Sequence, residues 1–178
     1  MKKGLTILGI IITIAVCGLL IFALISENTV DLTDSSEWHY VTHSEFKAKL
    51  PKDFESSSNL YYTSTGSEQI ACYSYEDIVF SVATLPMSSD LIEKLDLEKY
   101  ISNWEINGEK LEPIELNGGY YYTRTRNSSA DKTNDIFQAE ALFKGKNKVY
   151  NVIVYCPMED KAKYEESMQK WIESFTIR

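Results

Sequence analysis

The sequence predicts an α+β protein: an N-terminal transmembrane helix, then an antiparallel β-sheet domain with one inserted helix and a C-terminal helix packed on the sheet. Three observations predict this class: an uncharged apolar run over residues 4–25, short strand-like segments separated by turn residues, and an amphipathic stripe near the C-terminus. Beyond the N-terminus, the 178 residues have room for one ordinary domain. We therefore divide the chain into a membrane anchor (1–26), a polar stalk (27–37) and an extracytoplasmic domain (38–178).

The apolar run follows Lys2 and Lys3 and contains 22 residues. As a helix it is about 33 Å long, enough to cross a hydrocarbon layer of about 30 Å. The run ends in Leu-Ile-Ser at residues 24–26, which places a large residue where signal peptidase requires a small one. Cys17 lies in a partial lipobox, but Val16 occupies the position of the small residue. An uncleaved anchor with a cytoplasmic N-terminus is favoured over lipidation and over cleavage.

The charge of the domain limits its partners. All 26 acidic residues follow Ser26, whereas two of the 18 basic residues precede it, so residues 27–178 carry a net charge of −10. This charge excludes nucleic acid as a partner, because phosphates require a basic surface. It also disfavours peripheral attachment to anionic lipid, so residues 4–25 are expected to make the contact with the bilayer.

Strand signals dominate the first part of the domain. Apolar and basic residues alternate over Phe46–Leu50, and Pro51 ends that segment. Two β-rich runs, Ile70–Tyr75 and Ile78–Leu85, flank Glu76-Asp77 and predict a hairpin.

A helix is predicted next, over residues 91–104. Residues 88–90 offer N-cap oxygens, and Glu93 is placed to complete a capping box with Asp90. The apolar face of this segment is uneven, and Asp96 either interrupts the helix or restarts it.

Strands return in the second part of the domain, after the turn dipeptides Asn107-Gly108 and Asn117-Gly118. A polar loop is expected over residues 126–135. Four strands are predicted: Lys110–Leu116, Tyr120–Arg126, Phe137–Lys144 and Val149–Cys156. Within Phe137–Lys144 one face is apolar and the other mostly polar, which predicts one buried and one wet side. The last helix has its apolar stripe at Tyr164, Met168, Trp171, Ile172 and Phe175.

Three stretches carry a resemblance to a known family. "EFKAKLPKDF" is similar to the opening strand of PsbP-like domains, and "NKVYNVIVYCP" followed by "YEESMQKWIESFTI" is similar to their final strand and helix. The resemblance covers most of residues 40–177. This superfamily includes the extrinsic PsbP subunit of photosystem II and DcrB-like proteins of the bacterial envelope. The resemblance implies a non-catalytic binding or accessory role that acts through protein contacts.

The two histidines, His39 and His43, are the candidates for metal chemistry. With Glu45 they supply the ligand types of a zinc hydrolase. Their surroundings favour a strand, however, in which residues four apart lie about 13 Å from each other, too far to share an ion. We therefore expect two surface histidines, and neither a metal nor a cofactor. The sequence also lacks a G-x-S-x-G elbow and a phosphate-binding glycine loop.

Cys72 and Cys156 both fall in predicted strands of the extracytoplasmic domain. A disulfide between them forms if the two strands are neighbours with matched faces. The alternative is a pair of buried free thiols that pack as small apolar groups. The sequence leaves both open.

Twelve tyrosines offer material for a recognition surface. Strand alternation assigns about half of each tyrosine cluster to the core. Tyr121, Arg124 and Arg126, beside the polar loop, are the candidates for an exposed partner contact.

These observations favour a non-catalytic binding or accessory domain, anchored in the cell membrane and facing a protein partner of the bacterial envelope. Two alternatives stay open: a metal-dependent hydrolase that uses His39 and His43, and a carrier domain that holds a small ligand between sheet and helices.

Overall fold

The computed structural model describes residues 30–59, 66–106, 109–126 and 135–178. Over this part of the chain it confirms the α+β class, with antiparallel sheets and a C-terminal helix. The predicted anchor, the Asn107-Gly108 turn and most of the polar loop before Asp135 lie outside the described residues. No helix in the described ranges is long and apolar enough to cross a membrane.

The centre of the domain is an antiparallel seven-stranded sheet in the order β3-β4-β5-β11-β10-β9-β8. Its strands are β3 (Glu55–Ser56), β4 (Glu68–Tyr75), β5 (Ile78–Pro86), β8 (Ile114–Leu116), β9 (Gly119–Arg126), β10 (Ile136–Lys144) and β11 (Lys148–Pro157). The predicted hairpin at Glu76-Asp77 is confirmed: it joins β4 to β5, and Glu76 has a positive φ of 49°. The layers that cover this sheet come from the segments before β3, between β5 and β8, and after β11.

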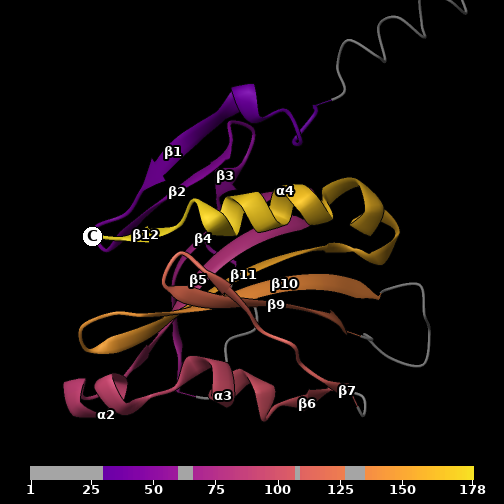
Figure 1. Ribbon diagram of the computed structural model, residues 1–178. Coiled ribbons are helices and arrows are strands. Elements are labelled where there is room, and N and C mark those ends of the chain that lie inside the picture. Colours follow the sequence, from indigo (N-terminus) through magenta and orange to yellow (C-terminus); the bar gives the residue numbers. More distant parts are fainter. Residues whose placement is uncertain (1–29, 60–65, 107–108, 127–134) are drawn as a thin grey trace, which may run out of the picture. The chain divides into compact units, whose positions relative to one another are not determined.

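Helices cover both faces of the main sheet (Figure 1). Helix α4 (Lys161–Glu173) lies on one face, and the short helices α2 (Ser89–Lys94) and α3 (Leu97–Ser102) lie on the other. A second, three-stranded sheet packs on the far side of α4. It consists of β1 (Trp38–Thr42), β2 (Phe46–Pro51) and β12 (Thr176–Ile177), while β6 (Glu105–Ile106) and β7 (Glu109–Lys110) form a separate small ribbon. Single-turn 3-10 helices, η1 (Ser35–Glu37) and η3 (Met158–Asp160), precede β1 and α4.

The apolar stripe of the last helix is confirmed. All five of its predicted members are buried, and Phe175 lies just after the end of α4. The indole of Trp171 meets Trp38 and Phe54 edge-on, at ring-centroid distances of 5.9 and 5.3 Å. Because Trp38 belongs to β1, this aromatic cluster joins the small sheet to α4.

The inserted helix differs from the prediction, because it is two helices instead of one. A second helix, α3, begins after Asp96. Asp96 is its N-cap, and the Asp96 carboxylate accepts a hydrogen bond from the Lys99 N–H at 3.0 Å. The predicted capping box is wrong: Ser88 is the N-cap of α2 without a side-chain hydrogen bond, and Asp90 lies inside the helix. Asp90 is the second residue of α2, in its first turn, where a carboxylate interacts favourably with the helix dipole but does not occupy the N-cap position.

Two predicted boundaries also move. Leu32 is fully buried and accepts a hydrogen bond from Trp38 Nε1 at 2.9 Å, so the folded unit begins at Leu32, within the predicted stalk. The strand predicted over Lys110–Leu116 is divided, because Leu111 turns into the core between β7 and β8. At both boundaries a leucine, Leu32 or Leu111, is buried, and the free energy gained by this burial outweighs the polar character of the neighbouring residues.

Candidate functional site

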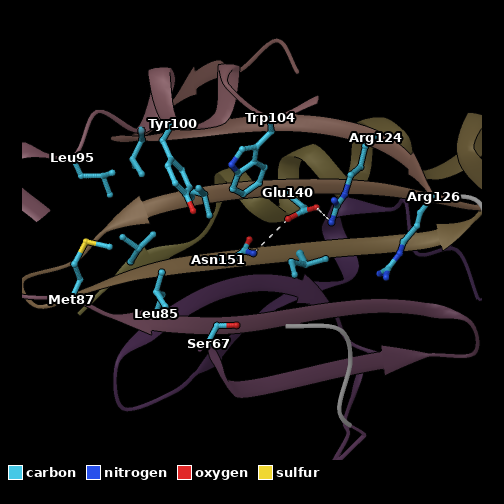
Figure 2. A pocket seen from close by; sticks show the side chains of 14 residues that line it. Ser67, Leu85, Met87, Leu95, Tyr100, Trp104, Arg124, Arg126, Glu140 and Asn151 are labelled. Carbon is cyan, nitrogen blue, oxygen red and sulfur yellow. Dashed lines mark hydrogen bonds and ion pairs between the residues drawn. The ribbon is translucent and has the colours of Figure 1, made fainter. Parts of the chain in front are cut away.

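The face of the main sheet beneath α2 and α3 holds a pocket of about 330 Å³ (Figure 2). Strands β5, β9, β10 and β11 form its floor, and α3, together with Leu95 before it and Trp104 after it, forms its roof. Its size lies at the lower end of the range for small-molecule sites. The lining residues are Ser67, Leu85, Met87, Leu95, Leu97, Tyr100, Trp104, Arg124, Arg126, Glu140, Leu142, Val149, Asn151 and Ile153.

The roof owes its position to an apolar cluster between α3 and the sheet. Leu97 and Ile101 of α3 are buried against Tyr122, Leu142 and Val149 of strands β9, β10 and β11. These contacts fix α3 by apolar burial, and Leu97, Leu142 and Val149 border the open space together with Tyr100 and Trp104.

Aromatic rings line the roof. Trp104 lies edge-on to Tyr100 and to Tyr122, with ring centroids 5.1 and 5.8 Å apart. Tyr100 is 42% exposed, so it marks the mouth of the pocket, while Tyr122 is buried beneath Trp104. Such edge-to-face pairs hold ring orientations well, and they provide a ligand with a flat apolar surface.

A buried carboxylate lies at the floor. The Glu140 side chain is 2% exposed, and its Oε1 lies 2.5 Å from Arg124 Nη2 and accepts a hydrogen bond from Gln138 Nε2 at 2.7 Å. Its Oε2 accepts from the Tyr122 hydroxyl at 2.8 Å and from Asn151 Nδ2 at 3.5 Å. Every one of these neighbours is a donor, so the ionised form of Glu140 is the one that satisfies them all.

Burial raises the pKa of Glu140, and the Arg124 guanidinium and the hydrogen bonds to the carboxylate oppose that rise. Burial together with the Glu140 charge also raises the pKa of Tyr122. The tyrosine therefore stays a neutral donor at physiological pH. The network is a fixed polar structure in an apolar floor, with its charge compensated by Arg124.

Two polar atoms of the network have no hydrogen-bond partner within the described part of the chain. They are Arg124 Nε, a donor, and Asn151 Oδ1, an acceptor, and both are buried. Both residues line the pocket, on opposite sides of the Glu140 carboxylate (Figure 2). Buried polar atoms are paired in the great majority of cases, so these two are the natural contact points for a bound polar group.

The structure separates the three residues predicted as one exposed contact. Tyr121 is 4% exposed, and burial with the nearby α4 carboxylates raises its pKa to about 12. The prediction that it is exposed is therefore wrong. Arg124 and Arg126 point to the opposite face of β9, as strand alternation requires, and both line the pocket.

The predicted histidine pair is not a cluster of ligands. His39 is exposed on β1, whereas His43 follows the end of that strand and stacks on Phe46 with ring centroids 5.0 Å apart. Glu45, the third candidate, is engaged by Lys148 and by the Tyr150 hydroxyl. The described residues contain no group of three or more histidine, cysteine or acidic side chains that could hold a metal ion.

Of the two alternatives left open for the cysteines, the structure has the pair of free thiols. Cys72 and Cys156 are buried free thiols, because β5 lies between β4 and β11 in the sheet. Second-neighbour strands are about 10 Å apart, which is beyond the reach of a disulfide. Burial raises the pKa of Cys72 to about 11 and that of Cys156 to about 12.

The sequence patterns do not mark four residues of the pocket as site residues: Tyr100, Trp104, Glu140 and Asn151. Glu140 falls on the mostly polar face of the strand predicted over Phe137–Lys144, and Trp104 is the last residue of the helix predicted over residues 91–104. The available signal was a glutamate and a glutamine on one face of a strand whose other face is wholly apolar. That signal marks a polar face, but it does not show that helices cover the face.

Comparison with known proteins identifies the fold alone. No family model matches the chain, and no curated protein sequence matches it significantly. The solution structure of cyanobacterial PsbP (CyanoP) from Synechocystis sp. PCC 6803 superposes with a TM-score of 0.54 at 11% identity, over 85% of this chain and 95% of that one. A crystal structure from Bacteroides thetaiotaomicron gives a TM-score of 0.49 at 11% identity, over 75% of this chain and 45% of that one. The PsbP-like resemblance predicted from the sequence is thus confirmed at the level of the fold.

Proposed function

We propose that this chain is a non-catalytic binding domain, held outside the cytoplasm by a membrane anchor, that carries a small organic ligand in the pocket between α3 and the main sheet. The observation that carries the proposal is the pocket itself. It combines an apolar lining with a few fixed polar groups, as ligand-binding sites do. Of the alternatives left open by the sequence, a ligand carrier agrees best with this geometry.

The chemistry of the polar groups supports binding over catalysis. Both oxygens of Glu140 already accept hydrogen bonds from protein donors. A general base needs a carboxylate oxygen that can approach the proton of a substrate. The raised pKa of Tyr122 likewise keeps its hydroxyl neutral, so it orients Glu140 and does not act as a nucleophile. The PsbP-like fold adds support for an accessory or binding role, by analogy.

The anchor and the location belong to the same proposal. Residues 4–25 are long and apolar enough to span a bilayer, and the preceding Lys2 and Lys3 favour a cytoplasmic N-terminus. The domain would then act at the outer face of the membrane, next to other envelope proteins. One of these would be the partner that delivers or receives the ligand.

A pair of leucine substitutions tests the ligand pocket. Leu95 lines the pocket, whereas Leu91, one turn earlier, is 59% exposed and lies outside it. Leu95→Trp should fill the apolar end, and Leu91→Trp should leave it open. The full chain is purified from membranes in a mild detergent and examined by native mass spectrometry for a retained small molecule.

The wild type and Leu91→Trp should carry the same added mass, and Leu95→Trp should have lost most of it. An added mass that survives in Leu95→Trp would place the ligand elsewhere, and the absence of any added mass in the wild type would overturn the carrier function. Protease treatment of intact cells tests the location: digestion of the domain supports an outer location, and protection of the domain in cells but not in lysates refutes it.

A further inference from the structure

The pocket offers an apolar end and a row of aromatic rings to the body of a ligand. Leu95 and Met87 lie at one end, and Tyr100 and Trp104 lie on the roof side (Figure 2). A flat apolar body fits such a lining, because it packs on the ring faces and buries its surface among the aliphatic side chains. The polar groups of the floor then meet the head group of the ligand.

The charge on the floor is balanced within the protein. Arg124 Nη2 lies 2.5 Å from the Glu140 carboxylate, and both oxygens of that carboxylate accept hydrogen bonds from further donors. Arg126, the third charged residue of the lining, has an interaction of its own and is not a free charge for a ligand. An anionic head group at Arg124 would lie beside the Glu140 carboxylate, and a cationic head group at Glu140 would lie beside the Arg124 guanidinium. The ion pair therefore favours an uncharged head group.

Two buried atoms beside this ion pair define the hydrogen bonds that the head group must make. Arg124 Nε–H is a donor and Asn151 Oδ1 is an acceptor, and neither has a partner among the described residues. They belong to residues on opposite sides of the Glu140 carboxylate (Figure 2). A buried polar atom that stays unpaired costs free energy, which a ligand that pairs with it recovers.

Glu140 also fixes the orientation of both residues. It holds the Arg124 guanidinium by a terminal nitrogen, which leaves Nε–H for another acceptor. It accepts a hydrogen bond from Asn151 Nδ2 at 3.5 Å, so the amide nitrogen of Asn151 faces the carboxylate and Oδ1 is left for another donor. Donor and acceptor are thus positioned before a ligand arrives.

From the balanced charge and the two unpaired atoms, and on the basis of the function proposed above, we infer that the ligand is an uncharged molecule with a flat apolar body and an amide head group. The amide oxygen accepts the hydrogen bond of Arg124 Nε–H, and the amide N–H donates to Asn151 Oδ1. An amide carries this acceptor and this donor on neighbouring atoms. An ester keeps the acceptor but has no donor, and a carboxylate lacks the donor and adds a charge.

Three probes with one apolar body test the inference: N-methyl-3-phenylpropanamide, methyl 3-phenylpropanoate and the anion 3-phenylpropanoate. The amide and the ester differ only in an N–H that is replaced by an oxygen. Their dissociation constants for the full chain in detergent are measured by isothermal titration calorimetry at pH 7. The amide should bind about tenfold tighter than the ester or the anion, because each of these leaves the Asn151 acceptor unpaired.

Asn151→Leu removes the acceptor and keeps a side chain of similar size. This variant should bind the amide and the ester within about threefold of each other, because no group is left that distinguishes N–H from an ester oxygen. Asn147→Leu, the same substitution at an exposed turn residue outside the pocket, is the matched control and should keep the tenfold preference. Far-UV circular dichroism of both variants checks that they are folded.

The remaining outcomes contradict the inference. Equal binding of amide and ester by the wild type would show that Asn151 does not contact the head group, and the carrier function would stand. Tightest binding of the anion would show that the pocket selects a negative charge. A tenfold preference that survives in Asn151→Leu would assign the donor contact to another residue. Binding of no probe would end the assignment to amides, and together with the absence of a retained molecule in native mass spectrometry it would end the carrier function too.

Discussion

Substitution of Arg124 by methionine should destabilise the domain by about 3 kcal/mol at pH 7, at the low end of the range for a buried ion pair that has lost one partner. The variant leaves the Glu140 carboxylate 2% exposed and without its counter-charge. The low end applies because Tyr122, Gln138 and Asn151 still donate hydrogen bonds to it.

The reverse substitution, Glu140→Gln, should cost less, about 1–2 kcal/mol. Arg124 is 25% exposed, so its charge can reach solvent when the carboxylate is gone, whereas Glu140 has no such route. The double variant Arg124→Met/Glu140→Gln should be more stable than Arg124→Met alone by about 1 kcal/mol or more, because it no longer buries an unpaired charge.

The effect of pH follows from the direction of the pKa change. Burial raises the pKa of folded Glu140, and loss of Arg124 removes an interaction that lowers it. The folded variant therefore binds a proton more readily than the unfolded chain, whose glutamate has a pKa of about 4.3. At pH values between the pKa of Glu140 in the unfolded chain and its higher pKa in the folded variant, the free energy of unfolding of the variant increases as the pH falls. The deficit of Arg124→Met relative to wild type should be largest at pH 7 and should shrink as the pH approaches 4.

Urea unfolding of the full chain in detergent, followed by the far-UV circular dichroism of the β-sheet at several pH values, measures these differences. Glu140→Gln serves as the pH control, since it has no carboxylate to titrate at this position. The reasoning is refuted if Glu140→Gln costs more than Arg124→Met, or if the deficit of Arg124→Met is the same at pH 5 as at pH 7.

Two further predictions concern groups outside the pocket. Cys72 and Cys156 should react slowly with a maleimide in the native protein and rapidly after unfolding, since burial raises both thiol pKa values; peptide mapping that finds either one labelled at the rate of a free thiol would contradict this. Glu45→Gln should cost about 1 kcal/mol at pH 7 through the lost ion pair to Lys148. Because Lys148 and Tyr150 lower the pKa of Glu45, this loss should disappear as the pH falls through that pKa, and urea midpoints that differ equally at pH 7 and pH 3 would refute it.

Local patterns in the sequence predict the elements whose burial is one-sided. The stripe that contains Trp171 predicts α4, and the alternation of Phe46–Leu50 predicts β2, because in each case a single face is apolar. The sequence does not reveal that β2 belongs to a separate sheet. That arrangement depends on β12, two residues that pair with Phe46 and Lys47 from the far end of the chain.

Prediction from a single apolar face fails at the pocket. The alternation within Phe137–Lys144 suggests a wet face at Gln138 and Glu140, and both side chains are in fact buried. Helices α2 and α3 lie over this face of the sheet, and neither is long enough for its periodicity to show which surface it packs on.

Apart from Gln138 on the same strand, the partners of Glu140 come from β9 and β11, which lie on either side of β10 in the folded sheet, so no local pattern joins them to Glu140. Tyr122 pairs directly opposite Glu140, Arg124 pairs opposite Gln138, and Asn151 approaches from β11 on the other side. The register that brings Arg124 to Glu140 also turns Tyr121 to the α4 face, because neighbouring residues of a strand face opposite sides. One register thus removes the tyrosine from the predicted contact and places the two arginines in the lining of the pocket.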